Sequence, residues 1–323
     1  MKAMLCKELG HPSKLVLEDV PSPVPGKKEV LISIKACSVN FPDTLVVQGL
    51  YQFKPELPFS PGSDIAGVVK AVGEGVKHVK VGDDVFGLVP NGGFAEEVLA
   101  PANTVFPKPP MMDYKIAASF MMAYGTSYYA LKDRANLKEG ETLLVLGASG
   151  GVGLAAVELG KLMGAKVIAA ASTQEKLDVC KQYGADELIN YKEEDLKKRV
   201  KELTGGKGAD VVYDPVGGDY TEAALRATAW EGRFLIIGFP AGIAKIPMNL
   251  PLLKGCQIVG VFWGSFASKD PNANMKNTMD LITYFGKGQL KPHIHGTYSL
   301  ENSRQALIDM MDRKVMGKII IEP

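Results

Sequence analysis

The chain has 323 residues, which is long enough for two domains with separate hydrophobic cores. Hydrophobic residues make up 46% of it and charged residues 23%, a composition typical of soluble globular enzymes. The formal net charge of +1 gives no electrostatic reason to expect a nucleic acid or a membrane as a partner. No apolar stretch is long enough to cross a bilayer, and residues 1–19 lack the hydrophobic segment of a signal peptide. The four cysteines form no Cys-x-x-Cys pair, so we expect reduced thiols in a cytoplasmic protein.

Residues 1–123 are rich in short strands and turns. Residues 30–36 alternate like a half-buried strand, and residues 64–72 predict another that ends at the turn of Gly73 and Gly75. Further turn signals follow at residues 81–85 and 92–96. Strands this closely spaced predict a compact, partly open β-barrel.

Strands and helices alternate from residue 124 to residue 265, as expected for a doubly wound parallel sheet. The central stretch, residues 142–153, reads Thr-Leu-Leu-Val-Leu-Gly-Ala-Ser-Gly-Gly-Val-Gly. It predicts a buried strand and a glycine-rich turn, followed by a helix that ends at Gly164 and a second strand over residues 165–171. In this strand–turn–helix–strand context, a glycine pattern indicates a dinucleotide site.

Small residues in this turn have specific uses. Gly150 lets the backbone approach a pyrophosphate, and Gly153 lets the helix pack closely on the strand, while Ala148 takes the place usual for the first glycine. The helix N-terminus offers free N–H groups and the positive end of its dipole to the phosphates. We therefore expect a bound dinucleotide, the alternative being a simple tight turn.

The later elements continue the same pattern. A helix is expected to begin near Ser172, with a capping box between Ser172 and Glu175, and to end near Gly184. We further expect parallel strands over residues 209–214, 232–238 and 256–262, an amphipathic helix over 274–285 and a final strand over 317–321. The nucleotide-binding domain, residues 124–265, is thus inserted between two parts of a catalytic domain, residues 1–123 and 266–323.

Eight short motifs carry a family resemblance across nearly the whole chain. They are Val-Asn-Phe-Pro-Asp at 39–43, Pro-Gly-Ser-Asp-Ile-Ala-Gly at 61–67, Val-Gly-Asp-Asp-Val at 81–85, Gly-Phe-Ala-Glu at 93–96, Ala-Ser-Gly-Gly-Val-Gly at 148–153, Gly-Ala-Asp at 184–186, Ile-Asn-Tyr at 189–191 and Gly-Lys-Ile at 317–319. With these motifs the sequence resembles the zinc-independent quinone oxidoreductases, the zeta-crystallin-like branch of the medium-chain dehydrogenase/reductase superfamily.

The resemblance implies an α/β fold class: a Rossmann doubly wound parallel sheet plus a GroES-like, partly open β-barrel catalytic domain. It implies that NADPH binds in a cleft between the two domains. It also implies a homodimer, often made by pairing the last nucleotide-domain strands edge to edge, here residues 256–262. An edge that is covered within the monomer is the alternative.

The end of the second strand favours NADPH over NADH. An NAD enzyme of this fold usually has an acidic residue there to bind the ribose hydroxyls. Here Ala171 is followed by Ser172 and Thr173, whose hydroxyls suit a 2′-phosphate, and Lys176 adds a positive charge. Tyr191 fits the position of a family tyrosine that also reaches this phosphate. An N-cap at Ser172 and a solvated Lys176 are the structural alternatives.

We expect no metal. Zinc dehydrogenases of the superfamily have a cysteine where this chain has Asn40 and a His-Glu pair where it has Ser63 and Asp64, and they carry a loop of four cysteines that is absent here. A catalytic zinc needs three protein ligands. His293 and His295 share one face of a predicted strand, but no third ligand is evident, which favours surface or packing roles.

Three residues are candidates for the chemistry. Asn40 and Asp43 resemble family positions beside the nicotinamide ring, and the Asn40 amide can donate to an acceptor oxygen. Asp43 can equally be a structural cap of the turn. Tyr51 resembles a substrate-pocket tyrosine that can stack on a ring, donate a proton or simply pack.

The resemblance and the position of the strand ends also assign further cofactor contacts. They are Ser149, Gly150, Gly151, Val152 and Gly153 in the glycine turn, Asn40, Thr126 and Gly217, the strand ends at Gly238, Phe239, Phe262 and Gly264, and Lys318. The aromatic rings after residue 261 suit a flat acceptor, although Trp263 can instead belong to the core.

Without a metal, alcohol oxidation is difficult, because nothing lowers the pKa of the alcohol. The leading hypothesis is therefore NADPH-dependent reduction of a small quinone. A rival is double-bond reduction in 2-alkenals, enones or enoyl thioesters, which the same residues would serve. A non-catalytic NADPH-binding protein is the third possibility; the near-neutral charge argues against an RNA-binding role and against membrane attachment.

Overall fold

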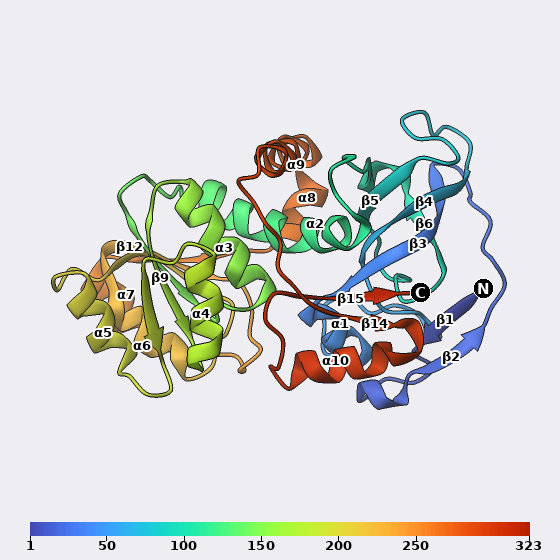
Figure 1. Ribbon diagram of the computed structural model, residues 1–323. Coiled ribbons are helices and arrows are strands. Elements are labelled where there is room, and N and C mark those ends of the chain that lie inside the picture. The colour runs from blue at the N-terminus through green and yellow to red at the C-terminus, as the bar shows by residue number, and fades with distance from the viewer. The chain divides into compact units, whose positions relative to one another are not determined.

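The computed structural model describes all residues 1–323, which divide into two compact units (Figure 1). The first consists of Met1–Met122 and Pro292–Pro323, and the second of Ala123–Lys291. The chain returns to the first unit at Pro292, so residues 266–291 belong to the second unit and not, as the sequence suggested, to the first. No helix is both long and apolar enough to cross a membrane.

The first unit is built on a seven-stranded sheet with the order β14-β15-β3-β4-β5-β7, in which β6 also pairs with β3. The strands are β3 (Glu29–Val39), β4 (Asp64–Val72), β5 (Asp84–Leu88), β6 (Glu97–Pro101), β7 (Val105–Pro107), β14 (Ile294–Ser299) and β15 (Lys318–Glu322). A separate pair is formed by β1 (Lys2–Leu5) and β2 (Val16–Asp19). All pairings in the large sheet are antiparallel except that of β14 with β15.

Apolar side chains of β3, β4, β5 and β15 form the core of the first unit. Val30, Ile32, Ile65 and Ile319 are completely buried. The alternating pattern predicted this for Val30 and Ile32, but Leu31 on the other face of β3 is buried as well, so the strand is not half-buried there. The helices α1 (Phe41–Val47) and α10 (Ser303–Met311) contact each other. Their placement positions the segment between β3 and α1, where the candidate residue Asn40 lies.

The second unit holds a six-stranded sheet that is parallel throughout, with the order β10-β9-β8-β11-β12-β13. Its strands are β8 (Thr142–Leu146), β9 (Lys166–Ala171), β10 (Glu187–Asn190), β11 (Ala209–Asp214), β12 (Thr228–Ile236) and β13 (Gln257–Gly260). The strand order reverses between β8 and β11, where open α/β sheets bind their ligands. The predicted doubly wound sheet is confirmed.

Helices flank this sheet (Figure 1). They are α3 (Gly151–Leu162), α4 (Gln174–Gln182), α5 (Leu196–Leu203), α6 (Tyr220–Ala227) and α7 (Asn249–Lys254). The unit also contains α8 (Trp263–Lys269) and α9 (Pro271–Gly286), which pack against each other. The helix α2 (Tyr114–Tyr128) contains the point where the chain passes from one unit to the next, and a π-helical turn at Tyr129–Arg134 follows it.

The side chains of α9 explain why residues 266–291 belong to the second unit. Lys132 donates to Asn277 Oδ1 (2.8 Å) and to Asp280 Oδ2 (3.0 Å), and Asn277 donates to Asp133. An amphipathic pattern shows that a helix has a buried face but not which core covers it. The sequence therefore predicted the helix but misplaced the boundary.

Two local predictions were wrong in detail. The N-cap of α4 is Thr173, whose hydroxyl accepts a hydrogen bond from Lys176 N (3.4 Å), so the expected capping box at Ser172 does not form. The last parallel strand, β13, is shorter than the expected residues 256–262, because Phe262 already serves as the N-cap of α8. A run of apolar residues predicts that a strand is present, but it does not predict the residues at which the strand ends.

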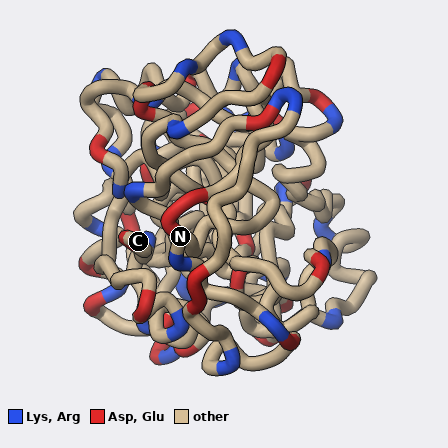
Figure 2. Tube along the Cα trace, turned by 90° about the vertical axis from the view of Figure 1, so that its right-hand side faces the viewer, with Lys and Arg blue, Asp and Glu red and all other residues tan.

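Lysine and arginine are interspersed with aspartate and glutamate along the chain trace (Figure 2). Exposed pairs such as Lys7–Glu18 and Lys115–Glu322 follow from this mixing. Pairs of this kind contribute little to stability, since water screens both charges.

The buried carboxylate of Glu158 accepts hydrogen bonds from both ends of the second unit. Tyr124, next to the first residue of that unit, donates a short hydrogen bond to Glu158 Oε2 in α3. The backbone N–H of Lys291, the last residue of the unit, donates to Glu158 Oε1 at 2.9 Å. One side chain of α3 therefore holds the two points where the chain enters and leaves the unit.

We expect Glu158→Ala to lower the free energy of unfolding by about 2–3 kcal/mol, because it removes the carboxylate that accepts from the buried Tyr124 hydroxyl and from the Lys291 N–H. Glu158→Gln keeps one acceptor oxygen and should lose about half as much. Urea denaturation would measure both values. The exposed Glu175→Ala serves as the matched control and should stay within about 0.5 kcal/mol of the wild type; an equal loss in Glu158→Ala and this control would contradict the assignment.

Candidate functional site

The glycine turn after β8 has the close packing that its sequence predicts. Gly147 has a left-handed φ of +52°. A Cβ atom at Gly153 would lie 2.4 Å from the carbonyl oxygen of Gly147, so only glycine allows α3 to begin this close to the turn. At Gly150 the nearest atom to such a Cβ would be 3.4 Å away, which leaves this position open to a ligand.

The N-terminus of α3 is free to bind an anion. Gly150 is the N-cap, and no side chain caps the helix. The N–H groups of Gly151, Val152 and Gly153 have no intrahelical acceptor, and they lie at the positive end of the dipole. The carbonyl of Val152 accepts from Ser127 Oγ (2.9 Å), which fixes this first turn to α2. The geometry of the turn therefore fits a dinucleotide phosphate.

The residues predicted to bind a 2′-phosphate gather where β9 and β10 end. Tyr191 N donates to the carbonyl oxygen of Ala171 (3.1 Å), which places the tyrosine next to Ser172 in the adjacent loop. Tyr191 also packs on Tyr220, with ring centroids 4.4 Å apart. Thr173 and Lys176 begin α4 directly after Ser172. No acidic residue separates Ala171 from α4.

The loops after β11 and β12 are bonded to each other. Gly218 N donates to Gly242 O and Ala241 N to Val216 O, both at 2.8 Å. A Cβ at Gly217 would lie 2.6 Å from Gly242 O and 3.1 Å from the Phe239 ring. The predicted contacts Gly217 and Phe239 therefore lie together, and Gly238 directly precedes Phe239.

Asp214, which the sequence analysis did not select, shapes these loops. Its Oδ1 accepts from the backbone N–H groups of Val216 and Gly217 (both 2.9 Å), and its Oδ2 accepts from Thr221 Oγ1 (2.7 Å). An aspartate at the end of a strand just before a Pro-x-Gly-Gly turn was the available signal, since aspartate commonly bonds the backbone of its own turn.

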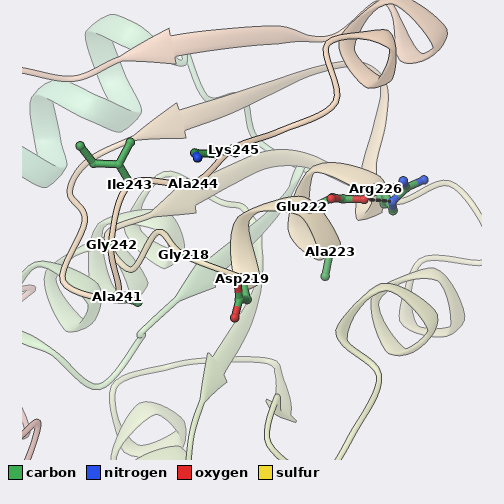
Figure 3. Close-up of a pocket in the computed structure, with 10 residues that line it drawn as sticks. All are labelled: Gly218, Asp219, Glu222, Ala223, Arg226, Ala241, Gly242, Ile243, Ala244 and Lys245. Atoms are coloured by element: carbon green, nitrogen blue, oxygen red, sulfur yellow. Dashed lines mark hydrogen bonds and ion pairs between the residues drawn. The ribbon is translucent and has the colours of Figure 1, made fainter.

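A cavity of about 650 Å³ lies beside the loops after β11 and β12, between the start of α6 and residues 241–245 (Figure 3). Arg226 and Glu222 form an ion pair at its edge. None of the predicted cofactor contacts lines it. The cavity nevertheless adjoins the predicted contact Gly217, which precedes Gly218 and packs against Gly242.

The aromatic residues after β13 have different environments. Phe262 is 56% exposed, whereas Trp263 is 4% exposed and its Nε1 donates to Asn274 Oδ1 (3.0 Å). The indole ring packs on Gly125, where a Cβ would lie 2.6 Å from it. Trp263 is thus a core residue. Its contact with Gly125 fixes the part of α2 that carries the predicted contact Thr126.

In the first unit, Asn40 and Asp43 lie together at the start of α1. Asn40 is the N-cap residue, and its backbone N–H donates to Asp43 Oδ2 at 2.7 Å. Asp43 is 4% exposed. The carboxylate therefore acts as the structural cap that the sequence left open as an alternative, and it holds the Asn40 backbone in place.

Lys318 completes this cluster. Its Nζ donates a short hydrogen bond to Asn40 Oδ1 and lies 3.8 Å from Asp64 Oδ2. Asp64 also accepts from Ser38 Oγ (3.1 Å) and from the backbone N–H of Met122 (3.4 Å), while its Oδ1 has no partner. The sequence analysis selected Lys318 and Asn40 but gave no functional role to Asp64.

Burial shifts the acid–base behaviour of this cluster. It raises the pKa of Asp43 to about 6 and the pKa of Asp64 to about 7, although the Lys318 ammonium opposes both changes. Burial also lowers the pKa of Lys318, against the two carboxylates. Both carboxyl groups therefore titrate closer to neutral pH than an exposed aspartate does, because burial disfavours their charged form.

Tyr51, the third catalytic candidate, follows α1 and is half-buried. Burial raises the pKa of its hydroxyl, and the negative charge of Asp43 raises it further. Its phenol therefore stays protonated at neutral pH and can donate a hydrogen bond.

No group of three or more His, Cys, Asp or Glu side chains is arranged to hold a metal ion. His293 precedes β14, where its ring lies against Gly317 and its carbonyl accepts from Lys318 N (2.9 Å). Burial lowers the pKa of His293, and the neighbouring His295 lowers it further.

Known proteins match the whole length of the chain. Residues 26–110 match the family of alcohol dehydrogenase GroES-like domains, and residues 151–283 match the zinc-binding dehydrogenase family. Quinone oxidoreductase-like protein 2 homolog of Nematostella vectensis is 40% identical over 99% of this chain and 88% of its own length. Quinone oxidoreductase of Rattus norvegicus is 36% identical over 99% of this chain and 97% of its own length.

A similar fold is found in the crystal structure of Escherichia coli quinone oxidoreductase complexed with NADPH. The match covers the full length of both chains at 29% sequence identity, with a TM-score of 0.94. Identity at this level over the full length, with both domain types matched in order, shows more than a common fold. The chain is therefore an oxidoreductase that belongs to the quinone oxidoreductase branch of the medium-chain dehydrogenase/reductase superfamily.

Proposed function

We propose that the protein is a zinc-independent, NADPH-dependent reductase of small quinones. The observation that carries this proposal is the state of Asn40 and Asp64, which stand where zinc dehydrogenases of the superfamily have metal ligands. Asn40 Oδ1 is bonded by the Lys318 ammonium, and Asp64 is fully buried beside the same cation. The Lys318 ammonium would repel a divalent metal ion at this place.

The second unit binds NADPH. The open helix N-terminus at Gly150–Gly153 suits the pyrophosphate, and the N-terminus of α4 with Ser172, Thr173 and Lys176 suits a 2′-phosphate. The Escherichia coli relative was crystallised with this cofactor. When bound, NADPH supplies the hydride, and the protein supplies binding, orientation and electrostatics.

The first unit would receive the acceptor. The Asn40 amide donates to an acceptor oxygen on which negative charge develops, with its backbone held by Asp43. Tyr51 supplies a protonated hydroxyl at the end of the same segment. None of these groups lowers the pKa of an alcohol, so the acceptor has to be electrophilic already. A quinone fulfils this condition; an enone or enoyl thioester is the rival substrate.

We also propose a homodimer. The strand β13 ends the sheet of the second unit and pairs only with β12. Trp230 in β12 and Leu252 and Leu253 in α7 are 68%, 78% and 65% exposed, an unusual set of large apolar side chains. The Trp230 ring lies 3.5 Å from the Cβ position of Gly255, between α7 and β13. A second copy that pairs with β13 would cover both the open edge and these side chains. The four free cysteines fit the proposed cytoplasmic location.

Oxidation of NADPH by the purified protein tests the function. We expect fast turnover with a simple benzoquinone, slow turnover with a 2-alkenal and crotonyl-CoA, and no change in rate after treatment with a metal chelator. Gly153→Val is the negative control, because its side chain collides with Gly147 O and blocks the turn. Preference for the alkenal or the thioester would favour double-bond reduction, and no turnover despite NADPH binding would favour a non-catalytic protein.

Lys176→Ala should raise the KM for NADPH about tenfold while leaving the KM for NADH nearly unchanged, since a charge-assisted hydrogen bond is worth roughly 1.5–3 kcal/mol. Steady-state kinetics with the two cofactors give the comparison. Lys181→Ala, in the last turn of the same helix, is the matched control and should affect neither. An equal rise for both cofactors would remove Lys176 from the 2′-phosphate site.

Ile258→Glu in the middle of β13 should convert the proposed dimer into a monomer, because two copies would bring like charges together at the shared edge. Sedimentation velocity would then report the mass of one chain, 34.7 kDa, and not twice that value. Ile243→Glu, at a position that is 79% exposed and outside this surface, is the control. A monomeric wild type would disprove the dimer.

A further inference from the structure

Two tyrosine rings join separate segments of the second unit. Tyr191 follows β10 directly, and Tyr220 is the first residue of α6. Their ring centroids lie 4.4 Å apart, and the ring planes are tilted by 48°. Both side chains are half-buried and pack against the core of the sheet. Because the rings touch, each one limits the rotamers that the other can adopt.

This pair lies at the edge of the sheet where open α/β proteins bind their ligands. Tyr191 comes after the carboxyl end of β10, and Tyr220 is separated from the carboxyl end of β11 by one short loop. The helices that follow these two strands, α5 and α6, contact each other. The bond from Tyr191 N to Ala171 O (3.1 Å) keeps Tyr191 beside Ser172, at the predicted 2′-phosphate site.

The backbone around Tyr220 is fixed on both sides. Thr221 Oγ1 donates to Asp214 Oδ2 at 2.7 Å, and both of these residues are buried. On the other side, Gly218 N donates to Gly242 O at 2.8 Å. Tyr220 lies between these two attachments, so its ring presents a surface of fixed position to its partner.

We propose that Tyr220 is a positioning residue for the cofactor, which acts through Tyr191 by holding its ring so that the hydroxyl faces the 2′-phosphate of NADPH. This role rests on the proposed 2′-phosphate site of Ser172, Thr173 and Lys176. A phosphate oxygen accepts a hydrogen bond from a tyrosine hydroxyl. NADH has no such phosphate, so the packing of Tyr220 favours NADPH without any contact of its own with the cofactor.

A double-mutant cycle tests this role, with dissociation constants from fluorescence titration as the readout. Tyr220→Leu and Tyr191→Phe should each raise the constant for NADPH about three- to tenfold, the range for loss of one aromatic contact or one hydrogen bond. The constant for NADH should change less than about twofold. The double variant should bind NADPH no more weakly than Tyr191→Phe alone, because no hydroxyl is left to position.

Conservative and distant replacements supply the controls. The contact between the two tyrosines is made by their rings, so Tyr220→Phe should keep the wild-type affinity for NADPH. Phe106→Leu removes a ring contact of the first unit, where Phe106 and Phe86 have centroids 6.0 Å apart, and should change neither constant. If Tyr220→Leu does not fold, Tyr220→Met replaces it in the cycle.

Equal losses for NADPH and NADH in Tyr220→Leu would overturn the proposal, because a residue that touches the shared part of the cofactor, or only supports the fold, gives that result. A further loss of NADPH affinity in the double variant would overturn it as well. The proposed 2′-phosphate site fails separately, if Lys176→Ala also leaves the ratio of the two constants unchanged. Neither readout depends on turnover, so a protein that reduces no quinone would still decide the role of Tyr220.

Discussion

The buried ammonium of Lys318 is the constraint on which the candidate catalytic unit depends. A charge in this position needs acceptors on every side. The sheet supplies them because β15 and β4 both pair with β3: Ile319 lies opposite Val39, and Asp64 lies opposite Ser38. These two registers bring the lysine, the asparagine and the aspartate to one end of β3. A slip of one residue in either pairing would turn a charged group to the other face of the sheet.

The second unit depends on a steric constraint instead. The approach of α3 to the Gly147 carbonyl is possible only with glycine at position 153, and it leaves the first-turn N–H groups of α3 at the point where the strand order reverses. Asp214 performs a similar task one strand away, by fixing the backbone after β11. Rigid backbone amides on neighbouring strand ends are suited to a long, charged cofactor, because little reorganisation is needed on binding.

The features that were predictable from sequence are those encoded by residues close together in the chain. The turn at residues 147–153 and the parallel strands follow from glycine spacing and short apolar runs. The contact between Lys318 and Asn40 joins residues 278 positions apart, and no local pattern shows that one would bond the other. The burial of Trp263 and the unit to which α9 belongs likewise depend on tertiary packing. The exchange of Ser172 for Thr173 as the N-cap is a shift of one residue, within the usual uncertainty of a helix end.

The cluster around Lys318 also bears on the kind of chemistry the unit can support. A divalent metal polarises an oxygen by direct coordination, whereas an ammonium that is already bonded to Asn40 and paired with Asp64 has little charge left to offer a substrate. The Asn40 amide to which it donates is a neutral group. A single neutral donor stabilises a developing oxyanion by a few kcal/mol, which is too little to activate an alcohol. A neutral donor of this kind is sufficient for an acceptor that is already electrophilic, such as a quinone, because the large driving force comes from the acceptor and the cofactor.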